Sequence, residues 1–291
     1  MHPFISTDKS TDLFIDQINA VKSEKNAVVV WTVHNTVSHE CLDREAELSR
    51  RRKVSRVCDR FIVHSDHAAK SIRTLYDIPM NRIFVIPHGK YDVDHSVLHP
   101  LIYDSLNNRK RMRLSILGEL RKYKNAEWAV DFLSNLNCSI DSDIRIELRL
   151  AGKCISQDQH DFFMSMADQH DFISLKLKRL SDSELMSEFC ESDFIFAPYS
   201  HLLTSGICLN ALSHGRPFIA PHYPSLSEFG STNNSILYYS HSDLATSLLK
   251  MNDFFHRGLL GYIFDPKEIV ASSSFLEWEA ILSSLPSNPF A

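Results

Sequence analysis

A short turn of small residues follows a buried apolar run in the last third of the chain. Thr204, Ser205 and Gly206 come after the predicted strand 193–197, and a helical segment over 205–213 opens at the same place. This turn offers two hydroxyls, free backbone N–H groups and the positive end of a helix dipole. Because open α/β sheets bind ligands at the carboxyl ends of strands, the turn is a candidate site for a phosphate or a ribose. An ordinary helix N-cap would use the same residue types.

A second candidate turn, after the predicted strand 113–117, carries positive charge. Gly118 begins the turn, and Arg121 and Lys124 follow. A glycine lets a ligand approach the backbone closely, and Arg and Lys form charge-assisted bonds with phosphate oxygens. The pattern predicts a diphosphate site, although a solvated basic loop would show the same spacing.

Polar residues, histidines above all, recur at the ends of three predicted strands in the first third of the chain. These cleft-lining candidates are His34 and Asn35, His64, and His88 and Gly89. His39 and Glu40 follow at the start of a predicted helix. A histidine in such a place can bind a phosphate or a sugar hydroxyl or transfer a proton, and a hydrogen-bonded structural histidine is the alternative. Zinc is disfavoured because the histidine pairs lack a third ligand at a suitable spacing.

Short apolar runs alternate with helical stretches in two blocks, a pattern that predicts α/β domains with parallel sheets flanked by helices. We expect two Rossmann-like domains, over 1–98 and 99–270, and a C-terminal helix in 271–291 that packs near their junction. The second block has about six strands, whereas the first has three, so we expect the N-terminal domain to be truncated. The histidines would then face the two phosphate-binding turns across a cleft.

Composition limits the classes of function. The chain has 291 residues with a net charge of −5, which argues against a nucleic-acid partner. Six cysteines without a CxxC motif, together with the lack of a signal peptide or a long apolar run, favour a cytoplasmic protein. The basic run Arg50–Arg56 is either a solvated helix face or a peripheral contact with anionic lipid at the inner membrane face.

Taken together, these motifs resemble those of GT4-like glycosyltransferases with the two-domain GT-B fold, as found in bacterial exopolysaccharide and cell-surface glycan synthesis. The resemblance extends from about residue 27 to about residue 249 and rests on the order and spacing of several motifs. The motifs are WTVHNTVSHE at 31–40, FIVHS at 61–65, IPHG at 86–89, GELRKYKN at 118–125, APY at 197–199, TSG at 204–206 and GRP at 215–217.

The resemblance implies transfer of a sugar from a nucleoside-diphosphate sugar to a hydroxyl of a glycan or a lipid-linked acceptor, in the synthesis of surface polysaccharide or glycolipid. It implies no metal or other cofactor, since protein cations and helix dipoles stabilise the leaving diphosphate. Donor binding would fall to Gly118, Arg121, Lys124, Tyr199, Thr204, Ser205, Gly206 and Asn210. The residues expected at the reacting centre are His34, His39 and Glu40.

Two departures from the family pattern keep other functions open. Many GT4-like enzymes carry two glutamates separated by seven residues, and the matching positions here are Leu202 and Asn210. The N-terminal domain is also shorter than usual in these enzymes. Both departures allow a non-catalytic module that binds a sugar nucleotide or a partner. A sugar-nucleotide epimerase would need the same nucleotide site.

Overall fold

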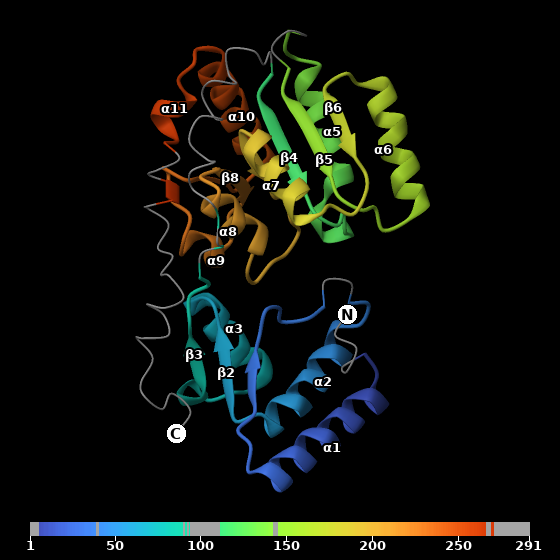
Figure 1. The fold of residues 1–291 in the computed structure, drawn as a ribbon, viewed down its shortest axis with the longest axis vertical. Coiled ribbons are helices and arrows are strands. Elements are labelled where there is room, and N and C mark those ends of the chain that lie inside the picture. Colours follow the sequence, from blue (N-terminus) through green and yellow to red (C-terminus); the bar gives the residue numbers. More distant parts are fainter. Residues whose placement is uncertain are drawn as a thin grey trace. The chain divides into compact units, whose positions relative to one another are not determined.

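The computed structural model describes residues 6–38, 41–89, 91, 93, 111–141, 145–265 and 269–270 (Figure 1). The described chain divides into two compact units. Unit 1 contains the residues up to 89 together with 201–204, and unit 2 contains those from 91 to 200 and from 205 to 270. The C-terminal helix predicted within 271–291 lies outside the described residues.

Unit 1 is built on a three-stranded parallel sheet in the order β1-β2-β3. Its central strand is the most apolar, with Phe61 and Val63 fully buried, because a parallel sheet is covered on both faces. The strands are β1 (Val30–Thr32), β2 (Arg60–Val63) and β3 (Ile83–Val85).

Three helices flank this sheet, and a side-chain oxygen caps the start of each one: Thr7, Asp43 and Ser65 accept hydrogen bonds from backbone N–H groups of the first turn. The first helix was not predicted from the sequence. Its Lys22 forms a 2.7 Å ion pair with Asp59, just before β2. The helical elements are α1 (Asp8–Lys25), α2 (Arg44–Val57), α3 (Asp66–Tyr76) and a 3-10 turn, η2 (Met80–Arg82).

Unit 2 is built on a six-stranded parallel sheet in the order β6-β5-β4-β7-β8-β9. The strand order reverses between β4 and β7, so the topological switch point lies at their carboxyl ends, where open α/β sheets bind ligands. The strands are β4 (Arg113–Leu117), β5 (Glu147–Ala151), β6 (Ile173–Lys176), β7 (Phe194–Phe196), β8 (Phe218–Pro221) and β9 (Ser235–Tyr238).

Helices connect these strands and pack on them, with α5 on β5, α6 on β6, α7 on β4, α8 on β8 and α10 on β9 (Figure 1). Ser181 and Glu184 form a capping box at the start of α7. The helical elements are η3 (Lys122–Lys124), α5 (Ala126–Asn137), α6 (Gln157–Gln169), α7 (Asp182–Glu191), α8 (Gly206–Ser213), α9 (Pro224–Ser227), α10 (His241–His256) and α11 (Leu260–Ile263).

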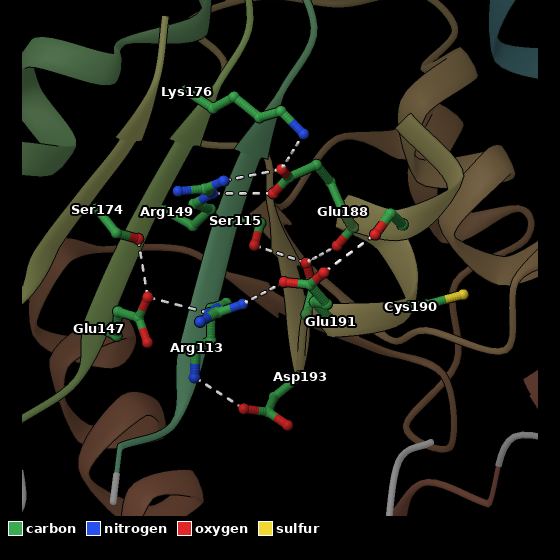
Figure 2. A network of polar contacts seen from close by, with 12 residues as sticks. Arg113, Ser115, Glu147, Arg149, Ser174, Lys176, Glu188, Cys190, Glu191 and Asp193 are labelled. Atoms are coloured by element: carbon green, nitrogen blue, oxygen red, sulfur yellow. Dashed lines mark hydrogen bonds and ion pairs between the residues drawn. The ribbon is translucent and has the colours of Figure 1, made fainter. Parts of the chain in front are cut away.

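A network of polar contacts joins α7 to the sheet (Figure 2). Glu188 is buried and accepts two hydrogen bonds of 2.9 Å from Arg149 on β5, and Lys176 on β6 lies 3.3 Å away. Burial opposes the charge of Glu188, but the bonds from Arg149 and Lys176 outweigh it and lower the pKa of the carboxyl. These charges therefore neutralise one another and fix α7 on its sheet.

The fold class predicted from the sequence is confirmed, since both units are parallel sheets flanked by helices. All six cysteines are free thiols, although Cys58 and Cys208 alone are buried.

Candidate functional site

Two glycines bring adjacent strands of unit 2 into close contact at the carboxyl edge of the sheet. Gly118 follows β4 and Gly152 follows β5, and Gly118 N donates a 2.9 Å hydrogen bond to the carbonyl of Ala151. A Cβ atom on Gly152 would lie 1.8 Å from the carbonyl oxygen of Gly118. The backbone of the Gly118 loop (residues 118–125) is therefore held beside β5 in a way that excludes any side chain at position 152.

Lys124 places its ammonium group at the base of this loop. Its Nζ donates a 2.6 Å hydrogen bond to the carbonyl of Leu117, the last residue of β4, and lies 6.0 Å from the centroid of the Tyr199 ring. The side chain is almost fully buried, and this burial lowers the pKa of Lys124 to about 8. A buried cation at the topological switch point can bind an anionic group of a ligand.

Arg121 is less available to an anion than its position in the sequence implies. Its guanidinium forms a 2.8 Å ion pair with Glu119, two residues earlier in the same loop, and both side chains are partly exposed. Glu119 thus offsets part of the positive charge that the sequence analysis attributed to this loop.

The predicted turn of Thr204, Ser205 and Gly206 opens helix α8. Ser205 is buried and caps the helix by accepting a 3.3 Å hydrogen bond from Cys208 N. Gly206 is exposed, and a Cβ there would lie 3.1 Å from the hydroxyl of Tyr91. On the next turn, the buried Oδ1 of Asn210 has no hydrogen-bond partner among the described residues. The helix therefore starts with its cap in place and with an amide oxygen able to accept a bond from a ligand hydroxyl.

Thr204 and Tyr199 complete the predicted donor-binding set. Thr204 belongs to unit 1, whereas Ser205 and Gly206 belong to unit 2. The buried Oγ1 atom of Thr204 has no hydrogen-bond partner within the described chain. Tyr199 is buried after β7, and its carbonyl accepts a 3.0 Å bond from the Tyr223 hydroxyl. Burial raises the pKa of Tyr199 well above its usual value, so its phenol stays protonated.

Unit 1 gathers His34, His64 and His88, called here the histidine group, at the carboxyl ends of its strands. The ring centroids of His34 and His64 are 5.3 Å apart, and those of His64 and His88 are 5.4 Å apart. His64 Nδ1 donates a 2.9 Å hydrogen bond to the carbonyl of Ile86, which leaves Nε2 unprotonated in the neutral ring. That Nε2 atom is buried and has no partner in the described chain.

Two members of the histidine group, His34 and His64, have surroundings that favour the neutral ring. Burial lowers the pKa of His34, and the neighbouring His88 adds to this effect. Burial also lowers the pKa of His64. The hydrogen bond to Ile86 raises this pKa in part, whereas the His34 and His88 rings lower it further. Neutral imidazoles can accept protons. Among the described residues, no cluster of three or more His, Cys, Asp or Glu side chains is arranged to hold a metal ion.

A buried ion pair on α2 holds the loop that carries His34 and Asn35. Arg51 and Glu47 lie 2.8 Å apart, and each side chain is less than one-tenth exposed. Glu47 accepts bonds from the backbone N–H and the hydroxyl of Ser38, at 2.7 Å each. Burial opposes the charge of Glu47, but bonds from Cys41, Ser38 and Arg51 outweigh it and lower its pKa to about 2. The pair therefore connects the loop to α2.

Arg51 belongs to the basic run Arg50–Arg56, whose central cations have partners within unit 1. Arg52 donates a 2.7 Å bond to the carbonyl of Leu75, and Lys53 lies 3.5 Å from Asp12 on α1. Together with the buried Arg51, three consecutive cations are thus engaged inside the unit. Within the described part of the chain, no helix combines the length and the apolar character that a membrane span needs.

The structure therefore brings the predicted residues together in two groups. His34, Asn35, His64, His88 and Gly89 lie in unit 1, and Gly118, Arg121, Lys124, Tyr199, Ser205, Gly206 and Asn210 lie in unit 2. His39 and Glu40 lie outside the described residues. Sequence reasoning missed the roles of Glu47 and Glu119, although the spacing of Glu47 and Arg51, four residues apart on a helix, could have indicated a pair.

Comparison with known proteins agrees with this architecture. Residues 12–90 match the model of Glycosyltransferase Family 4. No curated protein is similar enough in sequence to serve as a relative. TarM has a TM-score of 0.69 at 14% identity, over 96% of this chain and 53% of its own. Sucrose-phosphate synthase from Thermosynechococcus elongatus has a TM-score of 0.68 at 15% identity, over 94% and 75%. HepE from Anabaena, in complex with UDP, has a TM-score of 0.64 at 15% identity, over 96% and 77%.

The chain spans about half the length of TarM and three quarters of the other two proteins. At these identities the structural likeness establishes the fold. The family match within residues 12–90 adds sequence evidence for the resemblance predicted above. The chain thus has the GT-B architecture and resembles the GT4-like glycosyltransferases.

Proposed function

We propose that the chain transfers a sugar from a nucleoside-diphosphate sugar to the hydroxyl of a glycan or lipid-linked acceptor, in the cytoplasm, during the synthesis of surface polysaccharide or glycolipid. One observation carries the proposal: the buried ammonium of Lys124, hydrogen-bonded to Leu117 at the topological switch point of unit 2. Burying an ammonium group is costly, so a cation held at a ligand-binding edge is best explained by an anionic ligand.

The donor would bind in unit 2. Lys124 and the backbone of the Gly118 loop would hold the diphosphate, and the start of α8 would hold the distal phosphate or the ribose. HepE is described with UDP, and the pneumococcal O-GlcNAc transferase GtfA with UDP and GlcNAc. These neighbours support the choice of a sugar nucleotide as donor. The proposed reaction uses no metal, so Lys124 and the α8 dipole would stabilise the leaving diphosphate.

The acceptor would be activated in unit 1. A neutral His34 can take the proton from the attacking hydroxyl, and Glu47 and Arg51 position the loop that carries it. His39 and Glu40 remain predictions for the same centre. A peripheral contact with lipid through Arg50–Arg56 would draw little on Arg51, Arg52 and Lys53, because these three cations have partners in unit 1.

A non-catalytic module that binds a sugar nucleotide is the second candidate function. The ion pair of Glu119 with Arg121 favours this candidate, because the pair reduces the positive charge available to a leaving diphosphate. An epimerase would convert the donor alone.

Thermal-shift binding of UDP, GDP, ADP and CMP and their sugar conjugates, followed by product analysis, tests the proposal. Lys124→Met should reduce the stabilisation by a nucleoside diphosphate, whereas Lys122→Met, which changes an exposed lysine in the same 3-10 turn, should retain it. Binding without transfer or hydrolysis would support the module. An epimerised donor would identify an isomerase, and no shift with any nucleotide would contradict the proposal.

A further inference from the structure

Unit 2 contains a pocket that shares Tyr199 and Asn125 with the proposed donor site, whereas its other lining residues have no role in the proposed function. A pocket of about 560 Å³ opens at the carboxyl ends of β7, β8 and β9, within the range of about 300–1,000 Å³ typical of small-molecule sites. Aromatic rings from four separate segments line it: Trp128 of α5, Tyr199 after β7, Tyr238 and Tyr239 around the end of β9, and His241 at the start of α10. We call it the aromatic pocket.

The rings of the aromatic pocket are already packed by the fold. The centroids of Trp128 and His241 lie 4.7 Å apart, and Trp128 also stacks on Phe132 at 5.1 Å. Tyr239 is 77% exposed, yet His222 stacks beneath it at 4.4 Å with 20° between the ring planes. A stacked pair with one open face is a rigid platform, and such a platform costs little side-chain entropy when a ligand binds.

Polar groups accompany these rings. Trp128, Tyr238 and His241 have no side-chain hydrogen-bond partner among the described residues, although each carries a group that can donate or accept. Burial raises the pKa of Tyr238, so its phenol remains a donor at neutral pH. The residues that line the pocket include no Lys, Arg, Asp or Glu. The lining therefore suits a neutral ligand with an apolar face and hydroxyls at its edge.

A pyranose ring has these properties. Its axial C–H bonds present positive hydrogens to the negative face of an aromatic ring, while its hydroxyls lie around the edge. A nucleotide fits less well, because the lining itself includes no Lys or Arg to hold the phosphates, and Lys124, 6.0 Å from the Tyr199 ring, is already hydrogen-bonded to Leu117. We propose that the aromatic pocket binds a neutral pyranose unit of a glycan, separately from the nucleotide site at Lys124.

Saturation-transfer NMR on the full chain tests the proposal. The probes are the methyl α- and β-glycosides of glucose, galactose, mannose, rhamnose and N-acetylglucosamine, with maltose and cellobiose. We expect at least one probe to receive saturation at its ring C–H protons. Neither nucleotide nor turnover is needed, so the result does not depend on the transferase proposal.

Two substitutions at one exposed position locate the binding. Tyr239→Ala removes the platform and should weaken binding about tenfold, whereas Tyr239→Phe keeps the ring and should stay within about twofold of the parent. Excess uridine should not displace the sugar. The proposal is overturned if no probe binds, if uridine displaces the bound probe, or if Tyr239→Ala binds as well as Tyr239→Phe does.

Discussion

Arg51 on helix α2 donates a 3.0 Å hydrogen bond to the main-chain carbonyl of Asn35, in the loop that follows β1. Its guanidinium also reaches the Tyr76 hydroxyl at 3.3 Å, and that hydroxyl donates a 2.6 Å bond to the carbonyl of Thr36. Two adjacent carbonyls of one loop are thus fixed from two different helices. The position of His34 depends on this arrangement, because His34 immediately precedes Asn35.

Removing the negative partner of Arg51 should be strongly destabilising. Glu47→Gln leaves the buried guanidinium without its counter-charge, and breaking such a pair costs about 3–5 kcal/mol in the free energy of unfolding. Urea denaturation would measure the loss. Glu47→Leu combined with Arg51→Met removes both charges and should cost much less. Arg56→Ala, at an exposed position of the same helix, is the surface control, and a single variant no less stable than this control would contradict the structural role.

The affinity for a nucleoside diphosphate should fall as the pH rises through about 8. Lys124 has its pKa lowered to about 8, so its charge is present below this pH and is lost above it. The terminal phosphate is almost fully ionised in the same range, so we expect Lys124 to dominate the profile. Calorimetric titrations at pH 7 and pH 9 would measure the effect. Lys124→Met should bind about 1–3 kcal/mol more weakly at pH 7 and show no such fall. A parallel decline in this variant would assign the profile to another group.

Gly152→Ala should destabilise unit 2 far more than a typical glycine substitution. The new Cβ would meet the Gly118 carbonyl at 1.8 Å, so the strand ends must separate, and we expect a loss of about 3 kcal/mol or more. Gly258→Ala provides the comparison, since Gly258 also has a positive φ but nothing lies within 4 Å of its Cβ position. That change should cost about 1–2 kcal/mol. Equal losses in thermal or urea unfolding would show that the close contact is not required.

His34→Ala should lower turnover more than donor affinity, because His34 is proposed to accept the proton of the attacking hydroxyl. The pKa of His34 is lowered, so the ring is neutral at pH 7 and becomes charged only in more acidic solution. The kcat/KM of the parent should therefore decline only in solution more acidic than the usual pKa of a histidine. His67→Ala, on helix α3 outside the histidine group, should keep the parent profile. A variant of His34 that loses donor affinity but retains kcat would remove the residue from the catalytic role.

The sequence was sufficient to predict the strands of both sheets, but it did not predict helix α1. All nine predicted strands are present, because parallel strands buried on both faces appear as short apolar runs. Helix α1 was missed because its apolar side chains do not form one buried stripe: Leu13 is 59% exposed, while Phe14 and Ile18 pack against the core. Its capping box, formed by Thr7 and Ser10, was the available signal.

The candidate site likewise combines residues with a local sequence signature and residues that only the fold brings together. Gly118, Lys124 and Ser205 could be proposed from the sequence because a glycine, a lysine or a helix cap after a strand has a local signature; their part in binding remains a prediction. The charge of Arg121 was overestimated, since the pairing with Glu119 depends on the path of the loop. Trp128, Tyr238 and His241 escaped notice because they meet only when α5, β9 and α10 converge, and no spacing along the chain reports such convergence.

The contact between Gly118 and Gly152 has a kinetic consequence. Leu120 forms a β-bridge with Cys154 beyond it, so the Gly118 loop is joined to the segment after β5 on both sides of its glycine. A loop fixed in this way has little freedom to lose when a phosphate arrives. We therefore expect nucleotide association at unit 2 to follow a single exponential whose rate rises linearly with ligand concentration, without the plateau that a slow rearrangement before or after binding would impose.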